Sequence, residues 1–243
     1  MRDIRVCVIT DNEFLFHGFK KIIQKYSGIY EFEFYYSYFN TGIMPECFAK
    51  EEYRPICLKN ENEQFFSKFD LFLSIHCKQL FPKELVMKHR CINIHPGFNP
   101  YNRGWFPQVF SIIDKQPVGV TIHEMDAELD HGPIIIQQEI PIYEHETSFD
   151  VYQKIQELEL KLLADNLEVL ILGDYKTWLP DFEGNINNEA DFRSLCELDM
   201  DRVGTFREFL DILRATTFAP YDNAYFLDKD NNKIFVSVNL KKS

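Results

Sequence analysis

Short apolar runs bounded by turn-forming residues dominate the first 95 residues of the chain. Runs of this length are typical of buried strands, and stretches with helical spacing lie between them. Strands that alternate with helices predict an α/β fold, here a Rossmann-like domain with a mostly parallel twisted sheet. The strand pattern covers residues 4–9, 32–36, 69–75 and 91–95, and the helical pattern begins near Phe16, Leu85 and Pro107. Residues 40–62 show no clear period, and we leave them unassigned, with room for a short helix.

The pattern changes in the second half of the chain. Residues 118–123 alternate apolar and polar positions, and residues 134–142 are their expected partner strand across a loop that carries Asp130. Apolar side chains then recur at helical spacing over 147–172, which predicts one long helix with a core-facing stripe. The Asn- and Asp-rich residues 181–204 indicate a linker with short ordered pieces. A helix over 205–213 and a hairpin of 223–227 with 233–240 follow, so we predict domains at 1–180 and 181–243.

Composition narrows the class of protein. The chain has 243 residues, 45% of them hydrophobic, and its 38 acidic against 26 basic residues leave a net charge of −12. An acidic surface repels polyphosphate, which disfavours a nucleic-acid partner, although a local basic patch is compatible with this charge. The six cysteines form no C-x-x-C pair, so we expect buried, reduced thiols and a cytoplasmic protein. We expect no signal peptide and no membrane span, because the opening residues run directly into a strand and no apolar run reaches about 18 residues.

Candidate chemistry lies at the end of the strand over 91–95, where Pro96 and Gly97 turn the chain. Side chains two positions apart on a strand share a face, so Asn93 and His95 are expected side by side at the carboxyl edge of the sheet. A carboxylate that orients the imidazole would complete a proton-transfer group, and Asp130 is the best candidate. Taken alone, each residue has a structural explanation. Asn93 would cap a turn, His95 would be a loop histidine and Asp130 would be a solvated acid. The three together favour catalysis.

These residues carry a resemblance to a known family. The sequences Asn93-Ile94-His95-Pro96-Gly97, Val118-Gly119-Val120-Thr121-Ile122-His123-Glu124-Met125-Asp126 and Leu129-Asp130-His131-Gly132-Pro133 resemble the 10-formyltetrahydrofolate-dependent formyltransferases. The resemblance is strong over about residues 70–145 and implies that Asn93, His95 and Asp130 are the catalytic trio. Residues 214–226 are similar to a segment of the sugar N-formyltransferase branch.

The resemblance implies further site residues. It places the folate against Lys78, Leu80, Phe81 and Asp126, and the nucleotide-sugar against Asn12 and several residues after the catalytic strand. Those later residues are Arg103, Gly104, Trp105, Arg214, Tyr221 and Asn223.

Four of these assignments have a structural alternative. Asn12 would cap a helix, Lys78 would be a solvated loop residue, Arg103 would form an exposed salt bridge, and Trp105 would fill the core.

We assign no metal. His123-Glu124 lies in a strand pattern without the second histidine of a zinc helix, and the acids near Asp130 lack calcium-loop spacing.

The resemblance therefore predicts transfer of a formyl group from 10-formyltetrahydrofolate to a dTDP-linked aminodideoxysugar, most simply dTDP-4-amino-4,6-dideoxyglucose, for surface polysaccharide synthesis. Tetrahydrofolate would be the second product, and the C-terminal region would bind nucleotide and form a homodimer. A glycinamide ribonucleotide formyltransferase, a catalytically silent folate- or nucleotide-binding protein of the same fold and a purely structural protein are the alternatives. Whether His95 or Asp130 takes the proton from the amine stays open.

Overall fold

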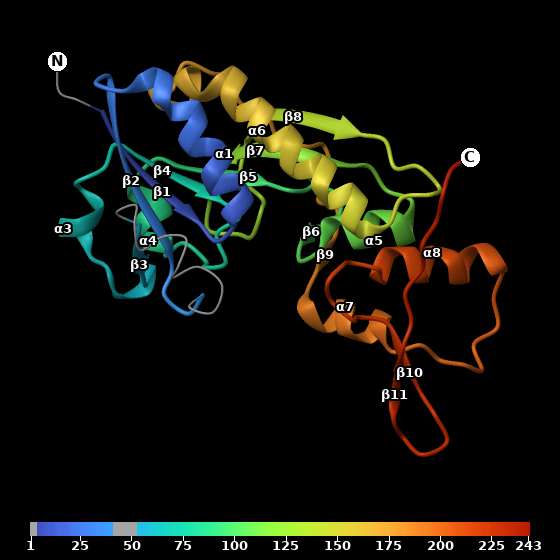
Figure 1. Cartoon of the computed structure of the whole chain (residues 1–243). Helices are drawn as coiled ribbons and strands as arrows, with labels where there is room; N and C mark the ends of the chain where they lie inside the picture. The colour runs from blue at the N-terminus through green and yellow to red at the C-terminus, as the bar shows by residue number, and fades with distance from the viewer. Residues whose placement is uncertain (1–3, 41–52) are drawn as a thin grey trace. The chain divides into compact units, whose positions relative to one another are not determined.

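The computed structural model describes residues 4–40 and 53–243, and Figure 1 shows the order of their helices and strands. Its first strands and helices follow the predicted alternation. They are β1 (Ile4–Thr10), α1 (Glu13–Ile23), η1 (Gln24–Tyr26), β2 (Tyr30–Ser37), β3 (Arg54–Ile56), η2 (Leu58–Asn60), α3 (Glu63–Phe66), β4 (Leu71–Ile75), α4 (Lys83–Lys88) and β5 (Cys91–His95).

The second half contains the predicted long helix and the elements around it. They are β6 (Arg103–Gly104), α5 (Pro107–Asp114), β7 (Val118–Glu124), β8 (Ile134–Ile140), α6 (Ser148–Leu172), β9 (Ile186–Asn187), α7 (Glu189–Cys196), α8 (Phe206–Thr216), β10 (Tyr225–Leu227) and β11 (Lys233–Phe235). Within the described residues, no helix combines the length and apolar composition that a membrane span requires.

A seven-stranded sheet in the order β3-β2-β1-β4-β5-β7-β8 organises the fold. The pairs from β3 to β5 are parallel, and β7 runs antiparallel to β5. All five residues of β4 are buried, as expected for a central parallel strand covered on both faces. The carboxyl ends of β1, β4 and β5 therefore meet at one edge of the sheet, where β5 ends at His95.

Alternate residues of β1 contribute to two cores of the sheet. Cys7 and Ile9 belong to a core cluster that also includes Phe66 of α3 and Leu85 of α4. On the side of α1, the Phe16 ring packs edge-on against Phe34 of β2 at a centroid distance of 5.3 Å. Helix α6 runs beside α1 (Figure 1), and its buried side chains continue the apolar stripe that the sequence predicts.

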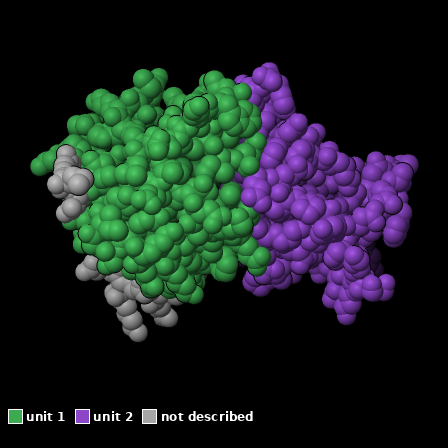
Figure 2. Space-filling model, turned by 90° about the horizontal axis from the view of Figure 1, so that it is seen from above, with its two compact units in different colours: residues 1–95, 121–137, 156–179 green, residues 96–120, 138–155, 180–243 purple. Residues whose placement is uncertain are grey.

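The chain divides into two compact units, which Figure 2 colours separately. Unit 1 contains residues 1–95, 121–137 and 156–179, and unit 2 contains residues 96–120, 138–155 and 180–243. In unit 2, β6 pairs with β9 in parallel, β10 pairs with β11 as an antiparallel hairpin, and α5 packs against α8. The division is interleaved along the sequence, so the predicted domain boundary at residue 180 stays a prediction.

The structure departs from the predicted elements mainly near the C-terminus. The predicted linker over 181–204 contains a complete helix, α7, which begins at a capping box formed by Asn188 and Asp191. The hairpin strands are three residues each, shorter than predicted. Val236 N–H still donates to the Ala224 carbonyl at 2.8 Å, but Val238 N–H donates to Thr217 Oγ1. Cys47 and most of the unassigned segment lie outside the described residues.

Candidate active site

Strand β5 carries two of the three predicted catalytic side chains. It pairs antiparallel with β7 so that Asn93 lies opposite His123 and His95 lies opposite Thr121. His95 is 3% exposed and His123 is 1% exposed. Two imidazoles and one carboxamide are therefore held on neighbouring strands by the backbone ladder of the sheet.

The third side chain, Asp130, comes from the loop between β7 and β8. This loop is tied down at its base, because Met125 N–H donates to the Cys91 carbonyl at 2.8 Å and Glu124 N–H donates to the Pro133 carbonyl at 2.9 Å. Gly132 lies so close to β7 that a Cβ atom there would be 1.9 Å from the Glu124 carbonyl oxygen. Asp130 itself has φ of 49°, a left-handed conformation that aspartate adopts more readily than most residues. Local backbone geometry thus aims its carboxylate.

The structure brings Asn93, His95 and Asp130 together. Asn93 Nδ2 donates a hydrogen bond to Asp130 Oδ1 at 2.9 Å, and His95 Nδ1 lies 3.5 Å from Asp130 Oδ2. One carboxylate oxygen therefore faces the amide and the other faces the imidazole. An aspartate in this position stabilises the charged imidazole and orients its second ring nitrogen for proton transfer. The catalytic roles of the trio stay predictions.

His123 is a further member of this cluster that the sequence reasoning did not assign to the site. Its Nε2 lies 3.3 Å from Asn93 Nδ2 and 3.9 Å from Asp130 Oδ1, and its Nδ1 lies 2.7 Å from the Glu124 carbonyl oxygen. The alternation in residues 118–124 marks His123 as a polar position, but only the register with β5 places it opposite Asn93.

The loop after β4, predicted to line the folate pocket, is fixed by side chains from other elements. Lys78 N–H donates to Asp11 Oδ2 at 2.7 Å, and Gln79 Nε2 donates to the Ile56 carbonyl at 3.0 Å. Lys78 Nζ lies 3.5 Å from Asn40 Oδ1, and Leu80 is 65% exposed. The loop therefore presents two of the predicted folate residues on a rigid base.

Phe81 and Asp126 have protein partners. Phe81 packs against the core cluster of α3 and α4. The carboxylate of Asp126 accepts a hydrogen bond from Glu128 N–H at 2.8 Å, and its other oxygen is 2.7 Å from His131 Nδ1. These contacts favour structural roles, and contact with folate stays a prediction for both.

His76 and Glu159 form a buried pair at the start of the same loop. His76 Nε2 is 2.8 Å from Glu159 Oε1, and Glu159 of α6 is fully buried. Burial raises the pKa of the Glu159 carboxyl, and the nearby His76 partly opposes this change. The pair ties the loop after β4 to the core helix.

Asn12 is the N-cap of α1. Its Oδ1 accepts a hydrogen bond from Leu15 N–H at 3.0 Å. Asn12 therefore has the helix-capping role that was the alternative to a substrate contact. The preceding Asp11 is buried, and its carboxylate accepts hydrogen bonds from Ser37 N–H and Lys78 N–H at 2.8 and 2.7 Å. Asp11 thus joins the carboxyl ends of β1, β2 and β4, and contact of Asn12 with substrate stays a prediction.

Arg103, Gly104 and Trp105 lie in unit 2. Arg103 is 3% exposed, so it is not the exposed salt-bridge residue that was the structural alternative to a substrate contact. Its Nη2 donates to Glu183 Oε1 at 2.7 Å, and its Nε has no hydrogen-bond partner within the described part of the chain. Gly104 has φ of 87° and lies where a Cβ would be 2.5 Å from the Asn187 carbonyl oxygen, which gives it a structural role in the β6–β9 pair. Trp105 is 48% exposed rather than a core residue.

Arg214 is buried, and its guanidinium is engaged within unit 2. Its Nη1 donates to the carbonyls of Tyr143 and Glu146 at 2.9 and 2.8 Å, and its Nε donates to Asp211 at 2.7 Å. This geometry favours a structural role over the predicted contact with substrate.

Two other predicted substrate residues of unit 2 differ in their surroundings. Asn223 Nδ2 donates to the Thr216 carbonyl at 3.0 Å, whereas Tyr221 is 59% exposed. Of these two, Tyr221 is the side chain whose exposure suits a ligand contact.

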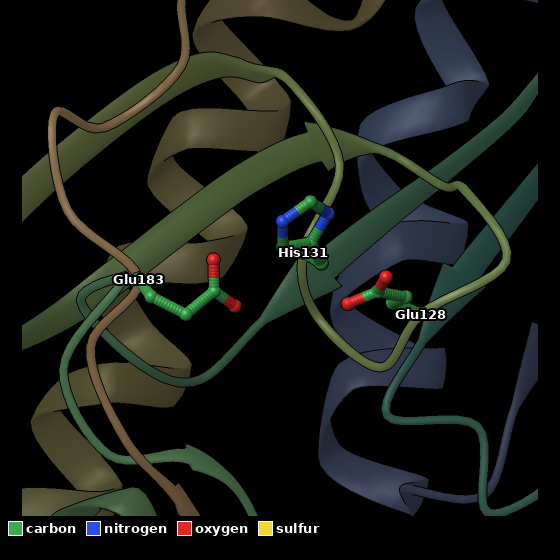
Figure 3. A group of neighbouring side chains, drawn as sticks. All are labelled: Glu128, His131 and Glu183. Carbon is green, nitrogen blue, oxygen red and sulfur yellow. The ribbon is translucent and has the colours of Figure 1, made fainter.

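Figure 3 draws two titratable neighbours of Asp130 on the β7–β8 loop, Glu128 and His131. His131 pairs with Asp126 of the same loop. Glu183, the third residue drawn, belongs to unit 2, where it is the partner of Arg103.

Comparison with known proteins identifies the family of the chain. A family model described as "Formyl transferase" matches residues 7–167, and one described as "N-formyltransferase dimerization C-terminal domain" matches residues 191–242. The dTDP-4-amino-4,6-dideoxyglucose formyltransferase of Mycobacterium tuberculosis is 49% identical over 178 residues, which are 73% of this chain and 76% of that protein.

Solved structures agree with this result. A sugar N-formyltransferase from Shewanella is 40% identical with a TM-score of 0.94, and a 4-N formyltransferase from Francisella tularensis is 43% identical with a TM-score of 0.93. Each alignment covers 99% of both chains, which confirms the predicted fold class. The chain is an enzyme that belongs to the formyltransferase family.

Proposed function

We propose that this enzyme transfers a formyl group from 10-formyltetrahydrofolate to the sugar amine of dTDP-4-amino-4,6-dideoxyglucose. The relative from M. tuberculosis is named for this substrate and is 49% identical over 73% of the chain. The solved 4-N formyltransferase from F. tularensis covers 99% of the chain at 43% identity. The observation that carries the proposal is the meeting of Asn93, His95 and Asp130 around one carboxylate.

The chemistry requires an amine with a lone pair. The amine nitrogen attacks the formyl carbon, the carbonyl oxygen becomes a tetrahedral oxyanion, and its collapse expels tetrahydrofolate. His95 takes the proton that the amine loses, on Nε2, because Nδ1 is the ring nitrogen that faces Asp130. Asp130 stabilises the imidazolium that results, and the imidazolium gives this proton to the folate nitrogen as it leaves, which returns His95 to its neutral form. A positioned base typically contributes about 100- to 10,000-fold.

Asn93 has two roles in this scheme. It holds the Asp130 carboxylate through the bond at 2.9 Å. It is also the predicted donor to the oxyanion, a role whose loss costs on the order of 100- to 1,000-fold in other enzymes. Because both N–H groups of Asn93 already face Asp130 and His123, donation to the oxyanion requires one of them to change partner.

The cofactor and nucleotide contacts follow from the predicted residues. We propose that the folate lies along the loop after β4, where Lys78 and the exposed Leu80 are presented on a fixed backbone. An alternative role for Lys78 is contact with the phosphates of the nucleotide. Tyr221, more than half exposed, is the aromatic candidate for contact with the base.

We propose a homodimer formed through the C-terminal region. The family model that matches residues 191–242 is described as a dimerization domain. Unit 2 also carries strongly exposed apolar side chains in this region, among them Val203 at 97% and Phe206 at 84%. Light scattering on a Phe206→Lys variant should show a shift from dimer to monomer, and an unchanged mass would remove this face from the interface.

We also propose that the enzyme works in the cytoplasm and supplies a formamido sugar for surface polysaccharide. The described cysteines are free thiols, which a reducing compartment maintains. The polysaccharide role rests on the proposed sugar substrate alone.

A panel assay tests the proposed substrate. Purified enzyme is supplied with 10-formyltetrahydrofolate and, separately, dTDP-4-amino, dTDP-3-amino and UDP-4-amino sugars and glycinamide ribonucleotide, and release of tetrahydrofolate is followed. We expect turnover of the dTDP-4-amino sugar. Turnover of glycinamide ribonucleotide alone would place the enzyme in purine synthesis. Binding of dTDP and folate without product from any acceptor would identify a catalytically silent relative.

A second test addresses the base. The His95→Asn variant should lose turnover and still bind dTDP with wild-type affinity in calorimetry. Wild-type rates in this variant would remove His95 from the mechanism.

A further inference from the structure

The amide of Asn93 is held from two sides. Its Nδ2 lies 2.9 Å from Asp130 Oδ1 and 3.3 Å from His123 Nε2. An ionised carboxylate can only accept hydrogen bonds, so the atom of Asn93 beside Asp130 must be the nitrogen. One N–H therefore points at Asp130, and the second is the one available to His123.

The contacts of His123 determine which of its ring nitrogens carries the proton. Nδ1 is 2.7 Å from the Glu124 carbonyl oxygen, and a carbonyl can only accept. Nδ1 therefore carries a hydrogen. Nε2 faces an N–H of Asn93, so it must offer its lone pair. His123 is thus a neutral imidazole with its proton on Nδ1, and its second nitrogen is an acceptor.

His123 reaches the catalytic group through Asn93. Its Nε2 is 3.9 Å from Asp130 Oδ1, which is beyond hydrogen-bond distance, and the His95 and His123 rings meet edge to face at a centroid distance of 6.4 Å. It is 1% exposed and opposite Asn93 in the β5–β7 ladder. The site can therefore be followed as a chain from the Glu124 carbonyl through His123, Asn93 and Asp130 to His95.

We propose that His123 is a positioning residue of the formyl-transfer site. As the Nδ1–H tautomer it accepts one N–H of Asn93 and so holds the amide plane, which keeps the other N–H on Asp130 Oδ1. The N–H that faces His123 is the one that changes partner when the oxyanion forms. This leaves Asp130 Oδ2 toward His95 Nδ1. Loss of the acceptor frees the Asn93 amide and loosens the orientation of Asp130, and the rate of the chemical step falls while substrate binding is retained.

Nuclear magnetic resonance tests the tautomer without any substrate. In protein labelled with ¹⁵N-histidine, the ring signals that vanish in a His123→Gln variant belong to His123. We expect a protonated Nδ1 and an unprotonated Nε2 at pH 7.5. Signals of the opposite tautomer, or of an imidazolium, would overturn the proposal. Because this measurement needs no acceptor sugar, a failed substrate panel would refute the proposed function and leave this test intact.

Kinetics test the positioning role, and this part rests on the proposed function for its substrate. The His123→Phe variant keeps a buried ring and loses the acceptor, whereas His123→Gln keeps an amide oxygen that can accept from Asn93. We expect His123→Phe to lower kcat about 10-fold, as loss of one neutral hydrogen bond of about 1.4 kcal/mol would, with both KM values within twofold. His123→Gln should restore kcat to within about threefold of wild type, because an accepted hydrogen bond of similar strength is regained.

Two controls separate positioning from packing. His17→Phe makes the same substitution at an exposed position of α1, where the side chain lies 3.7 Å from Glu13, and should leave kcat unchanged. In the Asn93→Ala background, measured by single turnover, His123→Phe should cause no further loss, since its effect passes through the amide that is already gone. Additive losses, equal damage in the Gln and Phe variants, or wild-type kcat in His123→Phe would each overturn the proposal.

Discussion

Gly132 offers a sharp test of how precisely the Asp130 loop must be placed. A Cβ added at this position would be 1.9 Å from the Glu124 carbonyl oxygen and 2.8 Å from its carbon. Real Cβ atoms essentially never come closer than 3.0 Å to such atoms, so a Gly132→Ala variant must move the loop by more than 1 Å. The neighbouring backbone cannot yield easily, because Glu124 N–H is bonded to the Pro133 carbonyl at 2.9 Å.

The displacement acts on the catalytic group. The Asn93–Asp130 bond of 2.9 Å would be stretched beyond hydrogen-bond range, and the 3.5 Å separation of His95 and Asp130 would change with it. A misplacement of about 1 Å can cost about 100-fold in rate, or roughly 2.7 kcal/mol in the activation free energy. We therefore expect kcat of Gly132→Ala to fall about 100-fold in the formyl-transfer assay, with an overpacking penalty of about 1–3 kcal/mol in unfolding free energy.

A matched control separates the two effects. Gly28 has φ of +77°, and a Cβ there would meet nothing within 4 Å. Gly28→Ala should therefore lose about 1 kcal/mol of stability from backbone strain alone and keep wild-type kcat. If Gly132→Ala, assayed well below its melting temperature, stays within threefold of wild-type kcat, the argument that this loop sets the catalytic geometry is refuted.

Three further outcomes are expected. Burial raises the pKa of Glu159 above the ordinary carboxyl pKa of about 4.3. Between these two pKa values the folded protein keeps a proton on Glu159 that the unfolded chain has lost. The free energy of unfolding of the wild type therefore falls as pH rises through this window. The Glu159→Gln variant should avoid this loss, so its stability relative to wild type in urea unfolding should rise from pH 4 to pH 7, and a difference that does not change with pH would contradict the assignment. Arg214→Met should destabilise the protein by about 3 kcal/mol, because two carbonyls lose their buried donor and Asp211 keeps the more exposed Lys115 as a partner, and a loss under 1 kcal/mol would restore Arg214 as a ligand contact. Burial raises the pKa of Cys77 to about 12, so iodoacetamide at pH 8 should modify Cys77 in urea and spare it in the native protein, as read by mass spectrometry.

The sequence predicts best the elements that lie deepest in the fold. β1, β4 and β5 are buried on both faces, which produces the continuous apolar runs that identify them. Helix α6 is recognisable because its apolar stripe repeats over many turns. Helix α7 has too few apolar positions for a visible period, and the capping box of Asn188 and Asp191 is the local signal that could have located it.

The sequence predicts that two site residues are close when they lie on the same strand. It does not predict this when they lie on different strands. Asn93 and His95 lie two residues apart, so strand geometry alone places them together. His123 joins them through an antiparallel register that no local pattern specifies. Arg214 is the opposite case, because the resemblance of residues 214–226 places it against the nucleotide-sugar, whereas the structure gives its donors to backbone carbonyls of the same unit.

The interleaving of the two units limits how this enzyme can be taken apart. The polypeptide passes from one unit to the other five times, and β7, β8 and α6 each begin in one and finish in the other. Truncation after residue 180 would remove α8, which packs against α5. Residues 96–120 and 138–155 would then remain without the rest of unit 2. No single point along the sequence therefore separates the two units.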